Sequence, residues 1–216
     1  MEGCKEIIIN VVDMKYFSTF SGVGGFELGI QLAYEELRIK DKKQGLQRVG
    51  DKEGQRSQRN NICLDGLTCV GYSEIDKYAI QIYEKHFRHK NYGDITTIKA
   101  EELPDFDLLV GGFPCPSWSI AGKRKGFEDL RGQLVFDIIR ILRGKKPKMF
   151  LLENVKGILS HDKGNSMEVI CEELCESGYA IDFEVLNSKN FGVPQNRERV
   201  FIVGKRLDTL PSGAIY

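Results

Sequence analysis

Short apolar segments with the residue types of β-strands alternate with segments of helical spacing along most of this chain. The expected strands cover residues 6–20, 67–73, 106–110, 149–153, 181–186 and 200–203, and the expected helices cover residues 25–39, 77–87, 133–143 and 166–177. Alternation of this kind predicts an α/β fold with a mostly parallel sheet and helices on both faces. Such sheets bind ligands at the carboxyl ends of their strands, so candidate site residues are expected directly after each strand.

A length of 216 residues with 41% hydrophobic residues fits one domain with one core. The formal net charge is zero, so a nucleic-acid partner would have to bind a local basic patch. No apolar run of membrane-spanning length occurs, and the first residues lack the apolar core of a signal peptide. These features predict a cytoplasmic protein without membrane association. The six cysteines are expected to be free thiols in that compartment.

Residues 40–61 differ from the rest of the chain, because they are polar and contain seven basic residues, three acidic residues and three glycines. This composition predicts an exposed insertion or loop. Its basic residues could be solvated linker positions, or they could form an arm that contacts a phosphate backbone.

A glycine turn, Phe20-Ser21-Gly22-Val23-Gly24-Gly25, joins the first strand to the first helix, and glycines allow close approach of the backbone to a ligand. A dinucleotide-binding fingerprint, Gly-x-Gly-x-x-Gly, that starts at Gly22 would need a glycine at position 27, where this chain has Glu27. This difference argues against a nicotinamide dehydrogenase. Glu74 and Asp94 come at the next strand ends, where acids can accept from ribose hydroxyls and an adenine amino group. Either acid could instead be a helix cap or turn residue. Together they predict a nucleoside-type ligand, and S-adenosylmethionine fits because no pyrophosphate site is indicated.

Cys115 lies between Pro114 and Pro116, in a loop that follows an apolar strand and two glycines. The prolines restrict this loop, which is unusual for a cysteine that only fills a core. Histidine and cysteine side chains elsewhere in the chain could in principle bind a metal, but they are expected to be structural: His86, His89, His161, Cys171 and Cys175. No metal site is therefore predicted.

Four motifs in this order resemble those of cytosine-5 DNA methyltransferases of the bacterial and phage restriction–modification type: the glycine turn, the segment 111–119, Glu153-Asn154-Val155 and Gln195-Asn196-Arg197-Glu198-Arg199. The resemblance extends over about residues 15–206. It implies an S-adenosylmethionine-dependent methyltransferase (Rossmann-like) fold and methyl transfer to carbon 5 of a flipped-out cytosine in duplex DNA. The setting would be a restriction–modification or phage self-protection system.

The resemblance also assigns roles to individual residues. Those that would line the S-adenosylmethionine site are Phe20, Gly22, Gly24, Glu74, Ile75, Asp94, Ile95 and Leu134. Cys115 would be the nucleophile, Glu153 and Arg199 would bind the target base with Arg197 nearby, and Asn154 would brace the cysteine loop. Ser119, Lys123, Arg124 and Lys125 would contact DNA. Ile75 stands where many relatives have tryptophan, so adenine stacking at this position is expected to be weaker.

The implied chemistry explains why these groups are needed. A thiolate that adds to carbon 6 of cytosine makes carbon 5 nucleophilic enough to accept a methyl group. Glu153, protonated or sharing a proton with ring nitrogen 3, would stabilise the charge that develops in the ring. Arg199 would donate to the exocyclic oxygen, and the target base would have to leave the duplex stack.

The resemblance implies that residues 1–216 form a catalytic and cofactor-binding domain that is incomplete at its C-terminus and lacks the target-recognition domain. The chain is then a fragment, one subunit of a split enzyme whose partner carries the recognition region, or a truncated and catalytically silent protein. Without its last segments, the domain is expected to expose apolar surface. A transfer-RNA cytosine-5 methyltransferase on the same fold is the alternative with the same chemistry, but the cysteine loop resembles the DNA enzymes more closely.

Overall fold

The computed structural model of the protein describes residues 14–43, 66–114 and 133–210. Within these ranges, six strands form one sheet with the order β2-β1-β3-β4-β6-β5. The strands are β1 (Met14–Thr19), β2 (Leu67–Ser73), β3 (Leu108–Gly112), β4 (Met149–Val155), β5 (Tyr179–Asn187) and β6 (Glu198–Arg206). The strands β1 to β4 pair in parallel, and β6 is antiparallel to both β4 and β5. Only β6 runs against the others, so the predicted mostly parallel sheet is confirmed.

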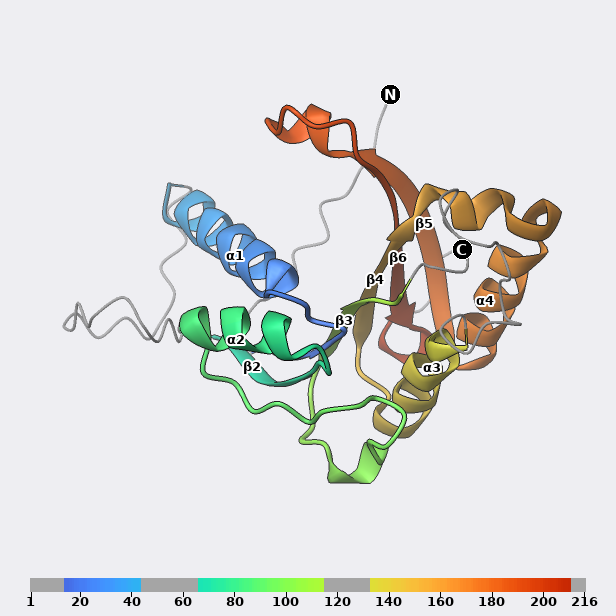
Figure 1. Ribbon diagram of the computed structural model, residues 1–216, viewed down its shortest axis with the longest axis horizontal. Helices are drawn as coiled ribbons and strands as arrows, with labels where there is room; N and C mark the ends of the chain where they lie inside the picture. The colour runs from blue at the N-terminus through green and yellow to red at the C-terminus, as the bar shows by residue number, and fades with distance from the viewer. Residues whose placement is uncertain (1–13, 44–65, 115–132, 211–216) are drawn as a thin grey trace.

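Helices cover both faces of this sheet, as predicted. They are α1 (Gly25–Lys43), α2 (Lys77–His86), α3 (Leu134–Lys145) and α4 (Asn165–Glu176). The first two lie on one side of the sheet and the last two on the other (Figure 1). Adjacent residues of β1 show the division, because Tyr16 packs with Tyr34 of α1 whereas Phe17 shares a core with Ile138 of α3.

Helix α1 differs from its prediction at two points. It continues through Lys43, so residues 40–43 of the predicted polar insertion are helical, while residues 44–61 lie outside the described ranges. Among its described side chains, Glu27 and Tyr34 are buried, whereas the apolar Leu37 is 47% exposed. The side of α1 that enters the core therefore includes an acidic residue that spacing alone assigns to solvent.

Among the described residues, part of the sheet is exposed on the α1 side. Helix α1 packs over β1, β2 and β3 through Tyr34, which shares a small core with residues of these three strands. On the same side, Leu151 of β4 pairs in register with Val203 of β6, and Val203 is 46% exposed. This surface fits the expectation that the domain exposes apolar groups.

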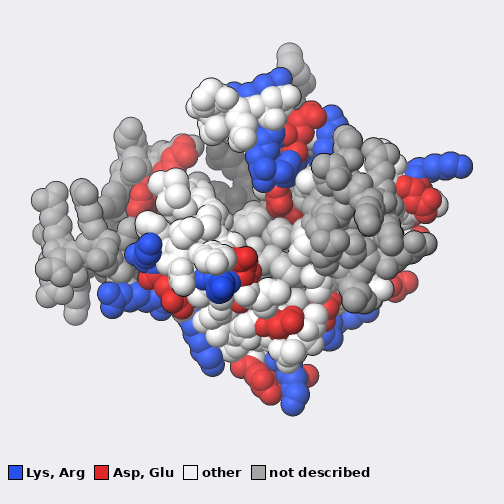
Figure 2. All heavy atoms as spheres, in the orientation of Figure 1, with Lys and Arg blue, Asp and Glu red and all other residues white. Residues whose placement is uncertain are grey.

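Short 3₁₀ helices complete the connections: η1 (Ala100–Glu102), η3 (Lys156–Gly164), η4 (Ser188–Phe191) and η5 (Leu207–Thr209). The segment with η4 projects beyond the ends of β5 and β6 (Figure 1). Charged side chains of both signs are interspersed on the face seen in Figure 2. In the ranges that the structure describes, no helix is both long and apolar enough to cross a membrane. Cys69, Cys171 and Cys175 are free thiols, as predicted for them.

The contact between β4 and β6 generates a stability prediction. Gly204 pairs with Phe150, and a Cβ added at Gly204 would overlap the buried Phe150 ring. Gly204→Ala should therefore lower the free energy of unfolding by about 1–3 kcal/mol, measured by urea denaturation. The control is Gly29→Ala in α1, where an added Cβ meets no atom within 4 Å. It should raise stability by about 0.5–1 kcal/mol, and a similar effect of both variants would contradict the tight contact.

Candidate active site

The glycine turn follows β1 and leads directly into α1. Phe20, Gly22 and Gly24 all have positive φ angles, of 52°, 55° and 93°. At Gly24 a side chain is also excluded by space, because an added Cβ would overlap the ring of Phe87. Around Gly22 no other atom lies within 4 Å of the Cβ position, so this part of the turn is open to a ligand.

Glu74 ties the glycine turn to the end of β2. Its Oε2 accepts a hydrogen bond from the backbone N–H of Gly22 at 2.9 Å. Its Oε1 accepts from the N–H groups of Ile75 and Asp76, both at 2.8 Å. The carboxylate is thus oriented by three backbone donors, and the exposed Ile75 side chain stands next to it. Glu74 and the open turn at Gly22 are adjacent, as a shared ligand site requires.

Asp94 is held in a local turn, where its Oδ1 accepts from both the N–H and the hydroxyl of Thr96. This is the structural role that the sequence left open for it, and a ligand contact would have to use the same carboxylate. The next residue, Ile95, is 2% exposed and belongs to the main core, so its side chain faces away from solvent. Phe20 and Leu134, the first residue of α3, are partly buried against that core.

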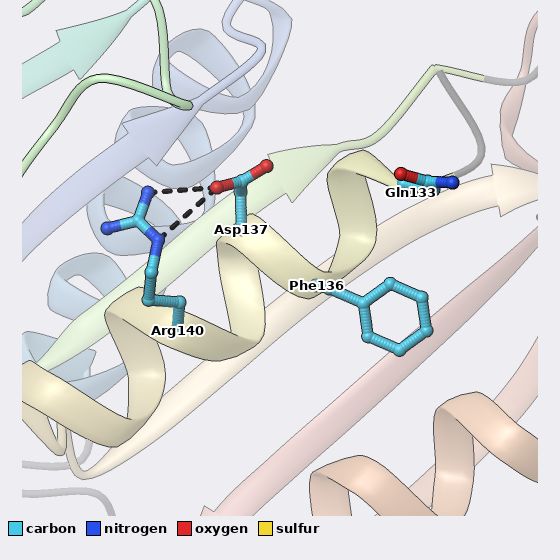
Figure 3. A pocket seen from close by; sticks show the side chains of 4 residues that line it. All are labelled: Gln133, Phe136, Asp137 and Arg140. Atoms are coloured by element: carbon cyan, nitrogen blue, oxygen red, sulfur yellow. Dashed lines mark hydrogen bonds and ion pairs between the residues drawn. The ribbon is translucent and has the colours of Figure 1, made fainter. Parts of the chain in front are cut away.

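The segment after Asp94 is fixed by a residue that sequence analysis missed. Arg140 of α3 donates to the carbonyl oxygens of Ile95 and Ile98, at 2.7 and 2.6 Å. It also pairs with Asp137 at 2.9 Å, as Figure 3 shows. The cavity of about 520 Å³ beside these groups is therefore lined by a guanidinium that is already engaged. The sequence does indicate the pair with Asp137, because the two residues are one helical turn apart. It does not indicate the backbone partners of Arg140, which are more than forty residues away in sequence.

Glu153 and Arg199 form an ion pair across β4 and β6, with 2.9 Å between Oε1 of Glu153 and Nε of Arg199. Their side chains are 23% and 22% exposed, so a ligand can reach both. Gly112 on β3 pairs with Glu153, and a Cβ there would lie 3.0 Å from Oε2 of Glu153. The two residues predicted to bind the target base are therefore neighbours. Arg197 lies two residues before Arg199 and has an exposed side chain.

Asn154 contacts the segment that leads to the cysteine loop. It is 1% exposed, and its Nδ2 donates to the carbonyl oxygen of Phe113 at 3.2 Å. Its Oδ1 accepts from the N–H of Val155, which fixes the orientation of the amide. The contact joins β4 to Phe113, two residues before Cys115, and the bracing of the cysteine loop itself stays a prediction. The predicted nucleophile Cys115 and the predicted DNA contacts Ser119, Lys123, Arg124 and Lys125 lie outside the described residues.

A cavity of about 600 Å³ joins the two halves of the predicted site. It lies between the start of α1 and the ends of β3, β4 and β6. Phe20, from the predicted cofactor site, and Glu153, from the predicted catalytic site, both line it together with Gly112. A ligand bound at the glycine turn and a group held by Glu153 would thus meet in one space.

Comparisons with known proteins agree with this geometry. The family model for C-5 cytosine-specific DNA methylases matches residues 14–213. Orphan methyltransferase M.SPRI of Bacillus phage SPR is 53% identical over 200 residues, which cover 91% of this chain and 39% of the phage protein. Type II methyltransferase M.HhaI of Haemophilus parahaemolyticus is 45% identical over 173 residues, which cover 80% of this chain and 53% of that protein.

Solved structures share the fold at lower identity. The S. pombe Dnmt2 methyltransferase superposes with a TM-score of 0.61 at 22% identity, covering 90% of this chain and 51% of the other. Entamoeba histolytica methyltransferase EhMeth has the same TM-score at 20% identity, with 94% and 55% covered. The predicted S-adenosylmethionine-dependent methyltransferase fold is confirmed. The chain spans only about half, or less, of the length of these proteins.

The Glu74 contacts predict a loss of stability in Glu74→Gln. The amide nitrogen of glutamine cannot accept, so either the Gly22 N–H or the Ile75 and Asp76 pair loses its acceptor. The free energy of unfolding should fall by about 1–3 kcal/mol in chemical denaturation. Glu84→Gln, at an exposed position of α2, is the matched control and should change stability by less than about 0.5 kcal/mol. Equal midpoints for the two variants would show that Glu74 does not hold the turn.

Proposed function

Since the chain belongs to the C-5 cytosine-specific DNA methylase family, we propose that it provides the catalytic and cofactor-binding part of a DNA cytosine-5 methyltransferase. The observation that supports this most strongly is the Glu153–Arg199 pair, which lines or adjoins the same cavity as Phe20 of the glycine turn. The methyl group would pass from S-adenosylmethionine to carbon 5 of a cytosine that has left the duplex stack. Restriction–modification or phage self-protection is the proposed setting, given the named relatives.

The residues around the glycine turn fit S-adenosylmethionine. Gly22 leaves open space, Glu74 presents an oriented carboxylate beside it, and Ile75 offers an apolar side chain that is 71% exposed. Phe20 lines the adjoining cavity. We propose that Glu74 accepts from the ribose hydroxyls, Asp94 from the adenine amino group, and Ile75 packs on the adenine ring. The bound cofactor would supply a methyl group on a sulfonium centre, which is a strong electrophile.

Cys115 is the proposed nucleophile. Its thiolate sulfur forms a bond to carbon 6 of cytosine, and the electron pair of the 5,6 double bond becomes available at carbon 5. After carbon 5 has accepted the methyl group, a base removes the carbon 5 proton. The electrons of that C–H bond restore the 5,6 double bond as the sulfur leaves carbon 6. The protein thereby regains its thiolate.

Glu153 and Arg199 are the proposed base-binding groups. Glu153 would face ring nitrogen 3, where it can hold or share a proton as charge enters the ring on addition of the sulfur. Arg199 would donate to the exocyclic oxygen. Cytosine presents these two atoms side by side, and the two side chains lie 2.9 Å apart at their nearest atoms. Arg197, Ser119, Lys123, Arg124 and Lys125 would contact the DNA around the flipped base.

Target recognition would come from a region outside these 216 residues, because the relatives are about twice as long or longer. We propose that this region belongs either to the same polypeptide or to a second subunit. The exposed Val203 and the open side of Leu151 on the sheet support such an additional contact. The alternative is a half-enzyme that is catalytically inactive without its partner chain.

A trapping experiment tests the reaction. The chain is incubated with S-adenosylmethionine and duplex DNA that contains 5-fluorocytosine. Fluorine replaces the hydrogen that a base normally removes from carbon 5 as a proton, so the reaction stops at the covalent adduct. A covalent protein–DNA adduct is expected, and it should vanish in Cys115→Ser. An adduct with transfer RNA but not with DNA would favour the RNA enzyme. Binding of S-adenosylmethionine without any adduct would favour the half-enzyme, and absence of both would contradict the proposed function.

The base-binding role of Glu153 makes a second, independent prediction. Glu153→Gln keeps the size of the side chain but removes the acid. In a preparation of the protein that gives the covalent DNA adduct, kcat/KM for DNA methylation should therefore fall by about 10²- to 10⁴-fold. Glu198→Gln is the matched control, because Glu198 also lies on this sheet but pairs with Lys156 at the surface. Similar losses in both variants would indicate a general surface effect and contradict the assigned role.

A further inference from the structure

Tyr83 of α2 is a fully buried residue that the proposed reaction does not use. Its hydroxyl oxygen lies 3.1 Å from Oε1 of Glu27 and 2.8 Å from Nδ1 of His89. Its ring stacks on Tyr72 with 3.9 Å between ring centroids. One side chain therefore contacts three segments that are far apart in sequence: the start of α1, the end of β2 and the loop that follows α2.

Each of these three segments leads to a residue proposed to hold S-adenosylmethionine. Glu27 comes three residues after Gly24, and Tyr72 comes two residues before Glu74. His89 begins the stretch that reaches Asp94, and this stretch is bound to β2 through hydrogen bonds between Tyr72 and residues 90 and 92. The same region also fixes the turn directly, because the ring of Phe87 fills the space that a Cβ at Gly24 would need. Tyr83 is thus the common neighbour of the three ligand-holding segments.

Glu27 is a costly residue to place here. Its side chain is completely buried, and burial raises the pKa of its carboxyl, while the hydroxyl groups of Ser18 and, to a smaller extent, Tyr83 act in the opposite direction. An apolar residue would fill the same volume without the desolvation cost of a carboxyl. What an apolar residue cannot supply is a directed bond between α1 and α2. A carboxyl at this position therefore points to a requirement for a fixed orientation of α1 relative to α2, and not for packing alone.

In this group the Tyr83 hydroxyl donates to Oε1 of Glu27, which leaves the hydroxyl oxygen free to accept from His89. Burial lowers the pKa of His89, so its imidazole is neutral near neutral pH. A proton on Nδ1 of His89 is then donated to the Tyr83 oxygen, and the Tyr83 hydroxyl donates to Glu27. His89 also stacks on Phe87, with 5.6 Å between the ring centroids, which fixes the plane of the imidazole.

We propose that Glu27, Tyr83 and His89 form a positioning network that holds the glycine turn, the Glu74 strand end and the Asp94 turn in one arrangement before the ligand binds. These residues are positioning residues, because they act through Gly22, Glu74 and Asp94. The identity of the ligand rests on the proposed function, whereas the fixed arrangement of the three segments does not. Affinity gained by preorganisation is lost when the network is broken, even though no direct ligand contact is removed.

The test removes one hydroxyl. Tyr83→Phe keeps the ring and its stack on Tyr72, and Tyr78→Phe is the control on the same helix, where the side chain is 64% exposed. Amide hydrogen exchange is measured for the full chain, together with S-adenosylmethionine binding by calorimetry. In Tyr83→Phe, exchange should accelerate in both residues 21–28 and residues 92–97, with little change in β1 and β3. The dissociation constant should rise about tenfold, the effect of one lost buried hydrogen bond.

Variants of Glu27 separate orientation from packing. Glu27→Gln keeps an oxygen that accepts from Tyr83, so its affinity should stay within about threefold of the wild type. Glu27→Leu keeps the volume without the acceptor and should behave like Tyr83→Phe. Faster exchange throughout the sheet, or unchanged exchange in both segments of Tyr83→Phe, would overturn the proposal. If the wild-type chain does not bind S-adenosylmethionine, the proposed function fails, and the exchange data alone still decide whether the network positions the three segments.

Discussion

The candidate site depends on close backbone approach at the carboxyl edge of the sheet, where three glycines have another residue's atoms close to the position of a side chain. An added Cβ at Gly111 would overlap Thr19 of β1, and one at Gly24 would overlap Phe87. At Gly112 it would crowd the carboxylate of Glu153. Because β1, β3 and β4 are adjacent and parallel, these glycines bring the turn after β1, the end of β3 and the acid of β4 to one cavity. Larger residues would separate the strands or fill the space that a ligand needs.

Polar side chains then fix this edge by hydrogen bonds to backbone groups of neighbouring segments. Glu74 accepts from three N–H groups, Arg140 donates to two carbonyl oxygens, and Asn154 joins β4 to the end of β3. Such bonds connect segments that lack regular pairing, where main-chain groups would otherwise be unsatisfied. The loops proposed to hold a ligand are thus ordered by side chains that bind their backbone. Substitution of Arg140 or Asn154 would act on the site through these loops, whereas substitution of Glu74 would also remove a proposed ligand contact.

The sequence predicted the parallel sheet, the position of the helices and the strands that carry Glu74 and Glu153 near their ends. The expectation that Asp94 closes a strand was wrong, because only Asn91 forms an isolated bridge to β2 and Asp94 lies in the turn that follows. It did not predict the direction of β6, because an apolar strand pattern has no polarity, and it placed residues 200–203 where the strand covers Glu198–Arg206. Glu27 was unforeseen as a buried residue, since acids normally mark the exposed side of a helix and its partner Tyr83 is 56 residues away. Motif order indicated the residues that we propose as catalytic, whereas the contacts that support Glu153 and Asn154 join segments far apart in sequence and are visible only in the structure.

The Glu153–Arg199 pair shows how the fold and the proposed chemistry fit together. With only about a fifth of each side chain exposed, the desolvation of this ion pair offsets much of its Coulomb attraction, so the pair adds little net stability. Its orientation is nevertheless well defined, because Arg199 also donates to the carbonyl oxygen of Glu198 at 2.8 Å. A base entering the cavity would meet an acid and a guanidinium that are already aligned, so little reorganisation is needed as charge develops in the ring. Because β6 is antiparallel to β4, its first residues lie at the carboxyl end of β4, and Arg199 pairs there with Val155, two residues after Glu153.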